Sequence, residues 1–475
     1  MVWRIVCAGV AALAMAGAAA PGGEVARNGA GWPCWRGPNG NGSADDGGFD
    51  LVDDFARAKL LWTSADTIPS NDEKFDRWHA GYSSPVVAGG RVFLFYYRPH
   101  GRKDFTFTPE DLAAFGTLGR GRNPPNVWQA DDIVHCFDAA DGKTLWKHVD
   151  GRGLIAAHGK NGGHHTQCAD EKRVYGVGTA GGVYCLDAAT GEPLWQNYLK
   201  ESYRDAFERS QAAGAGVFGR NGFNQAPCVI DDVVAVAADR FSAVGFDAAT
   251  GRKLWTVGIA GGGSGARGES VIPVIWTHKG TRYFIVANTC IVPKTGKVLW
   301  RIGGAITTSS PCVTEDYYIC SGLGSQAGRA APAAGSTCFR ISPGAFQKLW
   351  SLGPDRHPAM GCTDVVCGPY FLQASDDGKE DPTRNTVVVE IATGKVVATI
   401  GDTFRTLGYS PTRCRGKVFG GMYGLTMFIV RAEEFRLAYR GGRQQWANSC
   451  SPALADGKLC FRSGDRLVCY DLRKR

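Results

Sequence analysis

The chain has 475 residues, including 65 glycines and 22 prolines, and carries a formal net charge of +8. This content of glycine and proline is too high for a helical protein, while 44% hydrophobic and 11% aromatic residues supply ample core. The basic residues are scattered rather than clustered, which excludes the electrostatic footprint of a nucleic-acid-binding protein. The composition therefore indicates an all-β fold of short strands separated by turns.

The N-terminus has the pattern of a secretory signal peptide. Arg4 is followed by an apolar run over residues 5–15 and by the small residues 17–20, just before Pro21. The apolar run is too short to span a bilayer, and no later stretch approaches the roughly 18 apolar residues that a membrane helix needs. We expect residues 1–20 to be removed on export, and the mature protein to be soluble in the periplasm or at the cell surface.

The segment after the signal, residues 21–58, is expected to form an N-terminal extension. Within it, residues 39–50 superficially resemble a calcium-binding loop. However, Ala44 stands where the turn of such a loop needs glycine, and Asp50 stands where glutamate is expected. We interpret residues 39–50 as a solvated linker rather than a metal site.

One nonapeptide recurs along the chain, as DAADGKTLW at residues 138–146, DAATGEPLW at 187–195 and DAATGRKLW at 247–255. The pattern is typical of a β-hairpin, because the aspartate closes a turn through its carboxylate and the glycine takes the positive φ of a bulged turn. The Leu-Trp pair then re-enters a strand, and the indole has a large face for packing against a neighbour. The tryptophans expected to dock in this way are Trp62, Trp146, Trp195, Trp255, Trp300 and Trp350.

A second signal, a short polar stretch leading into Ser-Pro or a relative of it, precedes each hairpin and occurs eight times. From Trp146 to Trp350 the repeated tryptophans are 45 to 60 residues apart, which is the period of a four-stranded propeller blade. The gap before Trp146 is longer, and we attribute the excess to a Pro/Gly-rich insertion at residues 98–132 that interrupts the first blade.

The two ends of the chain predict how the ring closes. The last unit has three strands, near residues 451–455, 458–462 and 466–470, and then the chain stops without its Leu-Trp strand. An orphan Leu-Leu-Trp stands at residues 60–62 with no strands of its own before it. Pairing the orphan with the incomplete unit gives an eight-bladed β-propeller over residues 59–475 and removes the exposed edges of an open sheet.

Two further segments are expected to decorate the ring without a function of their own. Residues 200–213 place Tyr203 and Phe207 four positions apart among charged residues, which predicts a short amphipathic helix. Residues 324–336 are rich in alanine, glycine and proline, which predicts a flexible hairpin loop.

The 16 cysteines recur at equivalent places in the repeat. Cys136, Cys185 and Cys469, for example, each precede an aromatic residue or leucine and then aspartate. Recurrence at matched positions indicates small buried hydrophobic residues rather than a framework of disulfides. No two cysteines are adjacent and no Cys-x-x-Cys pair occurs, which excludes zinc-ribbon and thioredoxin-like sites.

The Asp-x-x-Thr-Gly-x-x-x-Trp pattern of residues 187–195 and 247–255 resembles the tryptophan-docking repeat of pyrroloquinoline quinone (PQQ) propellers. The sequence WPCWRGP at residues 32–38 resembles the opening of many exported PQQ-like repeat proteins from bacteria. The resemblance covers nearly all of the mature chain and implies the propeller fold. It implies no single function, because the family includes quinoprotein dehydrogenases and also the BamB lipoprotein, a noncatalytic scaffold of the outer-membrane assembly machine.

A quinoprotein alcohol dehydrogenase of this family would hold PQQ on the propeller axis, between a tryptophan and a disulfide of two adjacent cysteines. It would also bind Ca²⁺ through glutamate and asparagine side chains and use an aspartate as general base. This sequence has no adjacent cysteines and no convincing replacement set of carboxylates and amides. We therefore assign no catalytic residues and no metal site, and keep PQQ with Ca²⁺ as the weaker alternative.

The leading hypothesis is an exported, noncatalytic binding or assembly scaffold in the cell envelope, monomeric, with an envelope protein or a small molecule as its partner. The rival hypothesis is a PQQ-dependent oxidoreductase that oxidises an alcohol or sugar. A third is a structural module that only stabilises a larger envelope assembly.

Any ligand is expected at the axial funnel, where the segments linking each outer strand to the next inner strand converge. A mixed lining of histidine, arginine, glutamate and aromatic residues suits a polar or aromatic small molecule or a peptide. The alternative is that these loops form an ordinary polar rim filled with water and bind no ligand. The tentative funnel residues are His79, Tyr82, His164, His165, Asn224, Arg267, Glu269, His357, Arg405, Tyr409, Trp446 and Asn448.

Three histidines close together in the sequence form a candidate metal site. His158, His164 and His165 lie in a Gly-rich stretch, and imidazole suits Zn²⁺ and Cu²⁺. No cysteine or carboxylate stands nearby in ligand spacing, so we expect no metal there.

Overall fold

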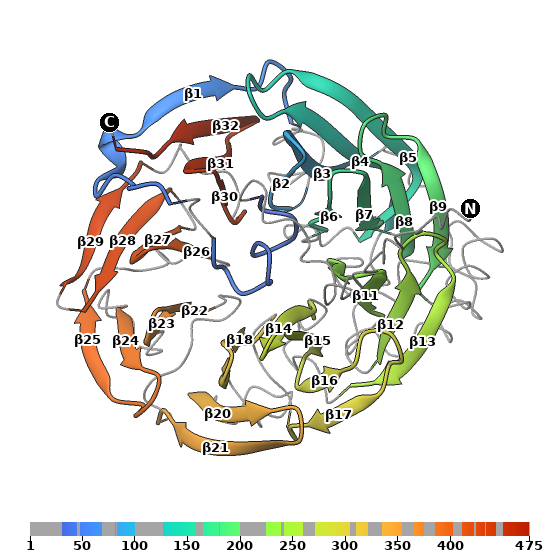
Figure 1. The fold of residues 1–475 in the computed structure, drawn as a ribbon. Coiled ribbons are helices and arrows are strands. Elements are labelled where there is room, and N and C mark those ends of the chain that lie inside the picture. Colours follow the sequence, from blue (N-terminus) through green and yellow to red (C-terminus); the bar gives the residue numbers. More distant parts are fainter. Residues whose placement is uncertain are drawn as a thin grey trace, which may run out of the picture.

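The computed structural model is a ring of strands, with the C-terminus next to β1 (Figure 1). Apart from the 3₁₀ turn η1, Phe55–Arg57, every regular element in the described part is a β-strand. The structure describes residues 31–44, 48–68, 81, 83–99, 127–156, 165–179, 181–199, 225–238, 242–259, 271–304, 310–321, 335–353, 364–374, 385–401, 411–421, 424–432, 434–442 and 450–474.

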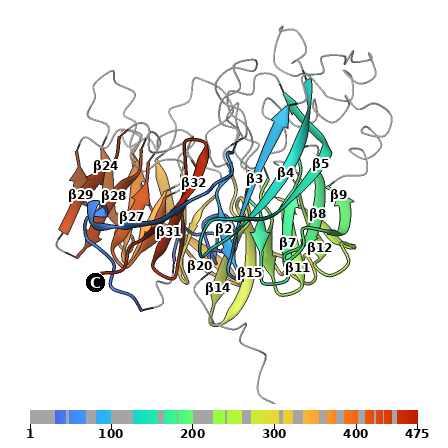
Figure 2. The same cartoon turned by 90° about the horizontal axis from the view of Figure 1, so that it is seen from above.

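The strands form eight antiparallel sheets of four strands each, arranged as the blades of a propeller (Figures 1 and 2). This confirms the predicted all-β, eight-bladed fold. The first four blades are blade 1, β2–β5 (Val86–Ala88, Arg91–Pro99, Val127–Asp138, Thr144–Ala156); blade 2, β6–β9 (Cys168–Ala169, Arg173–Val177, Gly182–Asp187, Pro193–Tyr198); blade 3, β10–β13 (Cys228–Ile230, Val233–Ala237, Ser242–Asp247, Lys253–Gly258); and blade 4, β14–β17 (Val274–His278, Thr281–Val286, Thr289–Ile291, Val298–Arg301).

The remaining blades continue the same up-and-down order from the axis to the rim. They are blade 5, β18–β21 (Cys312–Val313, Tyr317–Ser321, Ser336–Ser342, Ala345–Ser351); blade 6, β22–β25 (Val365–Cys367, Tyr370–Ala374, Thr386–Glu390, Val396–Ile400); blade 7, β26–β29 (Thr412–Cys414, Lys417–Gly420, Thr426–Arg431, Glu434–Arg440); and blade 8, β30–β32 (Ala453–Ala455, Lys458–Ser463, Arg466–Asp471) with β1 (Lys59–Thr63) as its outer strand.

Blade 8 closes the ring by combining the two ends of the chain. Strand β1 pairs antiparallel with β32, with Leu60 opposite Tyr470 and Trp62 opposite Cys469. The predicted closure is therefore confirmed. It leaves no blade without its outer strand, so no inner ladder is exposed as an edge.

A charged cluster reinforces this junction next to η1. Asp53 lies 3.2 Å from the Lys417 ammonium and 3.0 Å from that of Lys474, and it also pairs with Arg431. Burial raises the pKa of Asp53, but hydrogen bonds from Lys474, Arg431 and Lys417 outweigh this effect and hold the pKa well below its usual range. The carboxylate thus ties the chain before β1 to blade 7 and to the C-terminal residues.

Every blade has a β-bulge at the same place in its outer strand. In blade 2, Trp195 pairs with Cys185 while Pro193 pairs with Leu186, so Leu194 has no partner across the ladder. The bulge turns Leu194 outward, where it is 49% exposed. The same shift leaves the tryptophan directed toward the next blade.

Each of the six repeat tryptophans donates its indole N–H to a backbone carbonyl of the following blade. Trp62 of blade 8 bonds Ala139 of blade 1 at 3.0 Å, and Trp146 of blade 1 bonds Ala188 of blade 2 at 3.2 Å. The remaining bonds are Trp195 to Ala248 at 3.0 Å, Trp255 to Pro293 at 2.7 Å, Trp300 to Ser342 at 3.0 Å and Trp350 to Ile391 at 2.7 Å.

At five of these six junctions the indole also covers the hairpin glycine of the following blade. A Cβ added to Gly191, which has a φ of +78°, would lie 2.5 Å from the Trp146 ring. The hairpin aspartate completes the turn, since the Asp187 carboxylate accepts the backbone N–H groups of Ala189 and Thr190 at 2.9 Å. The nonapeptide therefore combines a turn with the platform on which the neighbouring tryptophan rests.

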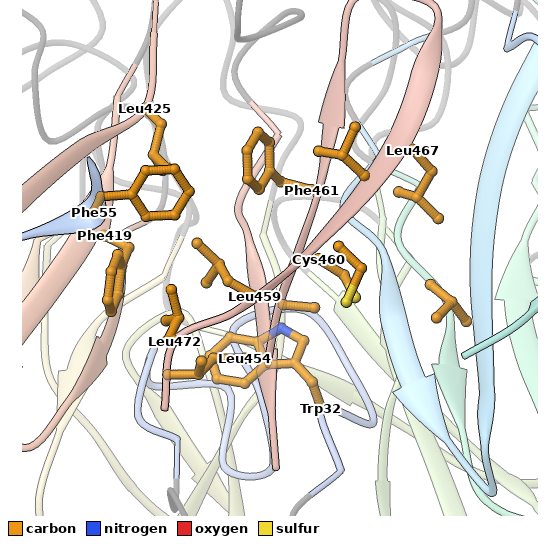
Figure 3. Packing of buried hydrophobic residues seen from close by; sticks show 14 of the residues in the cluster. Trp32, Phe55, Phe419, Leu425, Leu454, Leu459, Cys460, Phe461, Leu467 and Leu472 are labelled. Atoms are coloured by element: carbon orange, nitrogen blue, oxygen red, sulfur yellow. The ribbon is translucent and has the colours of Figure 1, made fainter. Parts of the chain in front are cut away.

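The core is divided among clusters that lie between the blades. The cluster around blade 8 includes Phe461, Leu459 and Leu454, together with Trp32 from the N-terminal segment (Figure 3). All fourteen cysteines of the described residues are buried and none is in a disulfide, as expected for small hydrophobic residues. No helix among the described residues is long and apolar enough to cross a membrane.

Two sequence-based interpretations were wrong in part. Residues 98–132 are not wholly an insertion, because β3 continues to Pro99 and β4 begins at Val127. The linker interpretation of residues 39–50 fails for residues 39–44, since Gly40 and Gly42 are buried against the inner strands. At both places the polar and glycine-rich composition suggested a loop, although part of the backbone there lies in strands or is buried against them. The expected helix at 200–213 lies outside the described residues, as does most of the expected loop at 324–336.

Replacing Trp62 by alanine should weaken ring closure. Trp62 is only 7% exposed, so we expect the free energy of unfolding to fall by about 3–5 kcal/mol, the usual cost of truncating a buried tryptophan. Leu61, in the same strand and 36% exposed, provides the control, and Leu61→Ala should change it by less than about 0.5 kcal/mol. Urea unfolding measures both variants, and equal losses would contradict the docking role of Trp62.

The glycine platform can be tested with a matched pair. Gly191 and Gly280 share a φ of +78°, but an added Cβ would strike the Trp146 ring at Gly191 and meet nothing within 4 Å at Gly280. Both alanine variants should lose about 1–2 kcal/mol to backbone strain. Gly191→Ala should lose about 1–3 kcal/mol more, because the clash displaces the indole. Thermal unfolding of the two variants checks the difference, and its absence would argue against the platform.

Candidate functional site

The N-terminal residues 31–44, which we call the strap, cross the propeller axis inside the ring of inner strands (Figure 1). Trp32 exchanges two backbone hydrogen bonds of 2.8 Å with Val87 of blade 1. The carbonyl of Pro33 accepts the N–H of Ala169 in blade 2 at 2.7 Å. The strap thus begins as a short antiparallel partner of the innermost strands.

On the opposite side of the axis the strap bonds two more blades. The Asn39 carbonyl accepts the N–H of Ile275 in blade 4 at 3.0 Å. The Gly42 carbonyl accepts the N–H of Arg413 in blade 7 at 2.7 Å, and Ala44 donates to the Arg413 carbonyl at 2.9 Å.

Side chains of the strap reach the other four blades. Trp35 packs with Ala226, just before the inner strand of blade 3, and Trp32 lies in one cluster with Leu454 of blade 8 (Figure 3). The Arg36 guanidinium donates to the Asp364 carbonyl at 2.6 Å, immediately before blade 6. It also lies 3.9 Å from the Cys312 sulfur of blade 5. The strap therefore contacts every blade and forms a floor across the axis.

Arg36 is the most unusual group in this floor. Its side chain is fully buried, and its guanidinium carbon lies 5.6 Å from the centre of the Trp35 ring. One terminal nitrogen bonds the Asp364 carbonyl, but Nε and the other terminal nitrogen have no hydrogen-bond partner among the described residues. Burying a guanidinium with so few hydrogen-bond acceptors costs desolvation free energy, so other contacts of the fold must offset this cost.

Asp364 is the buried carboxylate beside Arg36. It accepts the hydroxyl of Ser321, whose oxygen lies 2.7 Å from that of Ser336, and Ser336 in turn donates to the Gln373 side chain at 2.8 Å. Burial raises the pKa of Asp364 to about 7, and the Ser321 hydrogen bond and the Arg36 charge only partly oppose this rise. The group is therefore poised between its neutral and ionised forms near neutral pH.

A second guanidinium, Arg413, lies next to the strap. Its Nε has no hydrogen-bond partner among the described residues, and burial lowers its pKa. Together, Arg36 and Arg413 give the described part of the axis a positive balance against the single carboxyl group of Asp364. This balance favours acidic groups over cations.

The described axial residues do not fit a calcium-supported quinone. No group of three or more histidine, cysteine, aspartate or glutamate side chains within the described residues could hold a metal ion. The guanidinium of Arg36 beside Asp364, and that of Arg413 near Arg36, would repel a divalent cation by simple electrostatics. We derive no catalytic step from this arrangement.

Of the twelve predicted funnel residues, the structure describes only His165. Its ring is buried, its Nδ1 lies 3.0 Å from the Val177 carbonyl, and its centre lies 5.1 Å from that of Phe95. His165 therefore packs between blades 1 and 2. The others lie outside the described residues: His79, Tyr82, His164, Asn224, Arg267, Glu269, His357, Arg405, Tyr409, Trp446 and Asn448. The same holds for His158 of the rejected metal site.

Sequence reasoning missed Arg36, Asp364 and Arg413. Arg36 stands in the WPCWRGP motif that was noted, and Asp364 follows one of the signals that precede inner strands. These positions could have been singled out as conspicuous. Their burial and mutual proximity, however, depend on contacts between residues more than 300 positions apart, as in the bond from Arg36 to Asp364.

Comparison with known proteins gives a family match for part of the chain. The family model for outer membrane protein assembly factor BamB matches residues 130–350, which hold five of the six docking tryptophans. Residues 130–350 therefore resemble the PQQ-like repeat of that family model. No curated protein matches the chain in sequence.

Solved structures share the propeller fold of this chain at low identity. A quinohemoprotein alcohol dehydrogenase from Pseudomonas putida HK5 is 10% identical, with a TM-score of 0.54, over 93% of this chain and 80% of that one. The corresponding enzyme from Comamonas testosteroni is 12% identical, with a TM-score of 0.52, over 94% and 81%. A europium-containing methanol dehydrogenase is 11% identical, with a TM-score of 0.54, over 92% and 89%. Such similarity establishes the fold alone.

The titration of Asp364 predicts how stability depends on pH. Because burial raises the pKa of this group from 3.8 to about 7, its contribution to stability is full below about pH 4 and is lost as the pH rises to about 7. Asp364→Asn cannot ionise and should lack this loss. Urea unfolding at pH 5 and pH 8 should therefore show a smaller difference for Asp364→Asn than for the wild type, whereas Asp316→Asn, in an exposed turn, should behave as the wild type. An unchanged pH dependence in Asp364→Asn would contradict the assignment.

Proposed function

We propose that this propeller is an exported, noncatalytic binding or assembly scaffold of the cell envelope, and that its axial funnel holds the partner. The observation that carries the proposal is the strap, which contacts all eight blades and fills the axis with backbone and buried side chains. Because the strap links all eight blades, we expect the loops to extend from fixed positions on the ring. Preorganisation of that kind lowers the entropic cost of binding.

The charge of the floor indicates what the funnel would accept. Arg36 lies in the strap and Arg413 bonds it through its backbone, and both have guanidinium nitrogens without acceptors among the described residues. Guanidinium groups suit carboxylates and other planar acidic groups. We infer that an acidic segment of an envelope protein, or a small acidic molecule, is favoured over a cationic partner.

The family match supports a scaffold, since that family model is described as an outer membrane protein assembly factor. Localisation in the periplasm or at the cell surface follows from the N-terminal signal pattern, and the monomeric state remains a prediction. The third hypothesis, a purely structural module of a larger assembly, differs from ours in requiring no specific contact at the funnel.

The quinoprotein alternative remains open to a direct measurement. It requires PQQ and Ca²⁺ to bind the purified protein and to support oxidation of an alcohol or sugar. The dehydrogenases of similar fold carry no argument for this activity at 10–12% identity. Our proposal expects no quinone absorbance after reconstitution and no dye reduction.

The proposal can be tested by site-specific crosslinking in envelope preparations. A photoreactive phenylalanine analogue would replace Tyr409, a predicted funnel residue, and in a control protein it would replace Tyr317, which begins β19 at the opposite ends of the strands. We expect one defined adduct from position 409 and none from position 317. Adding Arg36→Gln to the position-409 protein should weaken the adduct, because the positive floor is lost.

The same preparations distinguish the alternatives. Absence of adducts together with PQQ-dependent dye reduction would replace the scaffold by the oxidoreductase. Equal adducts from positions 409 and 317 would instead favour a structural module held on several faces.

A further inference from the structure

A pocket of 180 Å³ opens on the outer rim between blades 1 and 2, away from the axial floor. Its mouth lies between the outer strands β5 and β9, and its interior reaches β3 and β4 of blade 1 and β8 of blade 2. Both blades thus contribute walls, and the pocket exists only because the blades are held side by side.

The walls of this rim pocket are largely aromatic. Phe95 comes from β3, Tyr184 from β8 and Tyr198 from β9, while Trp195 lines the pocket from β9 with its indole docked on blade 3. Val149, at the mouth on β5, is 51% exposed. Aromatic faces of this kind attract both apolar stems and cationic heads.

The carboxylate of Asp132 lies at the inner end of the pocket. It accepts the backbone N–H and the hydroxyl of Thr179, each at 2.7 Å, so both donors are neutral groups of blade 2. An added Cβ would lie 2.5 Å from one carboxylate oxygen at Gly153 and 2.7 Å from the other at Gly178. Glycine at these two positions is what lets the carboxylate sit between the two backbones.

The charges around Asp132 are of its own sign. Asp150 lines the pocket with it, while Asp131, the neighbouring residue in β4, is paired with Arg98 at 3.0 Å. Burial, followed by the smaller effects of Asp150 and Asp131, raises the pKa of Asp132 to about 7 against the opposing hydrogen bonds of Thr179. A cation entering the pocket would relieve this accumulation of negative charge.

We propose that the rim pocket is a binding site for a primary ammonium group carried on a short apolar stem. The ammonium would donate hydrogen bonds to Asp132, and the stem would pack against Tyr184 and Tyr198. The volume is close to the roughly 150 Å³ of cavities that hold a benzene-sized ligand, which suits a stem of four or five carbons. This inference does not rest on the proposed function of the axial funnel.

Two sources can supply this chemistry, a free alkylamine or a lysine side chain of a polypeptide. Both present an ammonium after a four-carbon stem, and they differ in the bulk at the far end. The pocket opens to the rim, where Leu194 and Leu145 are 49% and 46% exposed on the same two outer strands. These two leucines would add contacts with the backbone of a bound polypeptide, whereas a free amine is too short to reach them.

Titration calorimetry with the full mature chain tests the proposal. The probes are n-butylammonium, Nα-acetyl-lysine methylamide and the uncharged n-butanol. We expect each ammonium probe to bind at least about tenfold more tightly than n-butanol, a preference equivalent to about 1.4 kcal/mol. Tighter binding of the lysine derivative would identify a polypeptide as the source, and tighter binding of n-butylammonium would identify a small amine.

Variants locate the binding in this pocket. Asp132→Asn keeps the size of the side chain and removes its charge, and it should weaken both ammonium probes about tenfold without changing n-butanol. Asp141→Asn, an exposed aspartate of the same blade outside the pocket, should have no effect. If Asp132→Asn fails to fold, Asp150→Asn at the pocket wall should give a smaller loss of the same sign.

The proposal would be overturned if ammonium probes and n-butanol bound equally, or if neither ammonium probe bound at millimolar concentration. Ammonium binding that neither aspartate variant weakens would also overturn it. A failed crosslink at Tyr409 would leave these outcomes untouched, so failure of the funnel proposal and failure of the rim pocket are distinguishable.

Discussion

The indole of each docking tryptophan donates a hydrogen bond to a hairpin carbonyl of the next blade, and five of the six indoles also pack on the hairpin glycine, as Trp146 does on Gly191. These contacts fix both the distance and the angle between adjacent blades. Because the pattern is copied around the ring, the small rotation from one blade to the next accumulates in one direction. A flat or open array would lose the contact at the six junctions that have a docking tryptophan, so this interaction favours the closed ring.

An accumulated rotation closes only if the last blade meets the first, and the chain supplies three separate means for this. Strand β1 completes blade 8, Asp53 binds Lys417 and Lys474 beside it, and Trp62 docks on blade 1. An eight-bladed ring also leaves an axis that the inner strands do not fill by themselves. The strap occupies that space and satisfies backbone groups of the inner strands.

The parts of the structure that sequence could predict are those encoded locally. The hairpins of residues 138–146, 187–195 and 247–255 follow from turn chemistry, and the orphan segment at 60–62 revealed the closure. The strap could not be predicted in this way. Glycine and polar residues suggested a solvated linker at 39–50, but Gly42 is buried by strands hundreds of residues distant. Likewise nothing local to Asp132 indicates that Thr179 of another blade will approach it.

Residues that depart from the repeat therefore indicate the proposed binding sites better than residues that follow it. The copied residues, such as the hairpin glycines and docking tryptophans, are engaged in holding the ring. Blade 1 departs most, with strands of 12 and 13 residues in β4 and β5, and these strands carry Asp132 and Asp150 into the rim pocket. The strap, which has no copy elsewhere, brings Arg36 to the axis. A residue that a repeat does not need for closure is free to bind, and in this propeller such residues collect at two places, the axis and the junction of blades 1 and 2.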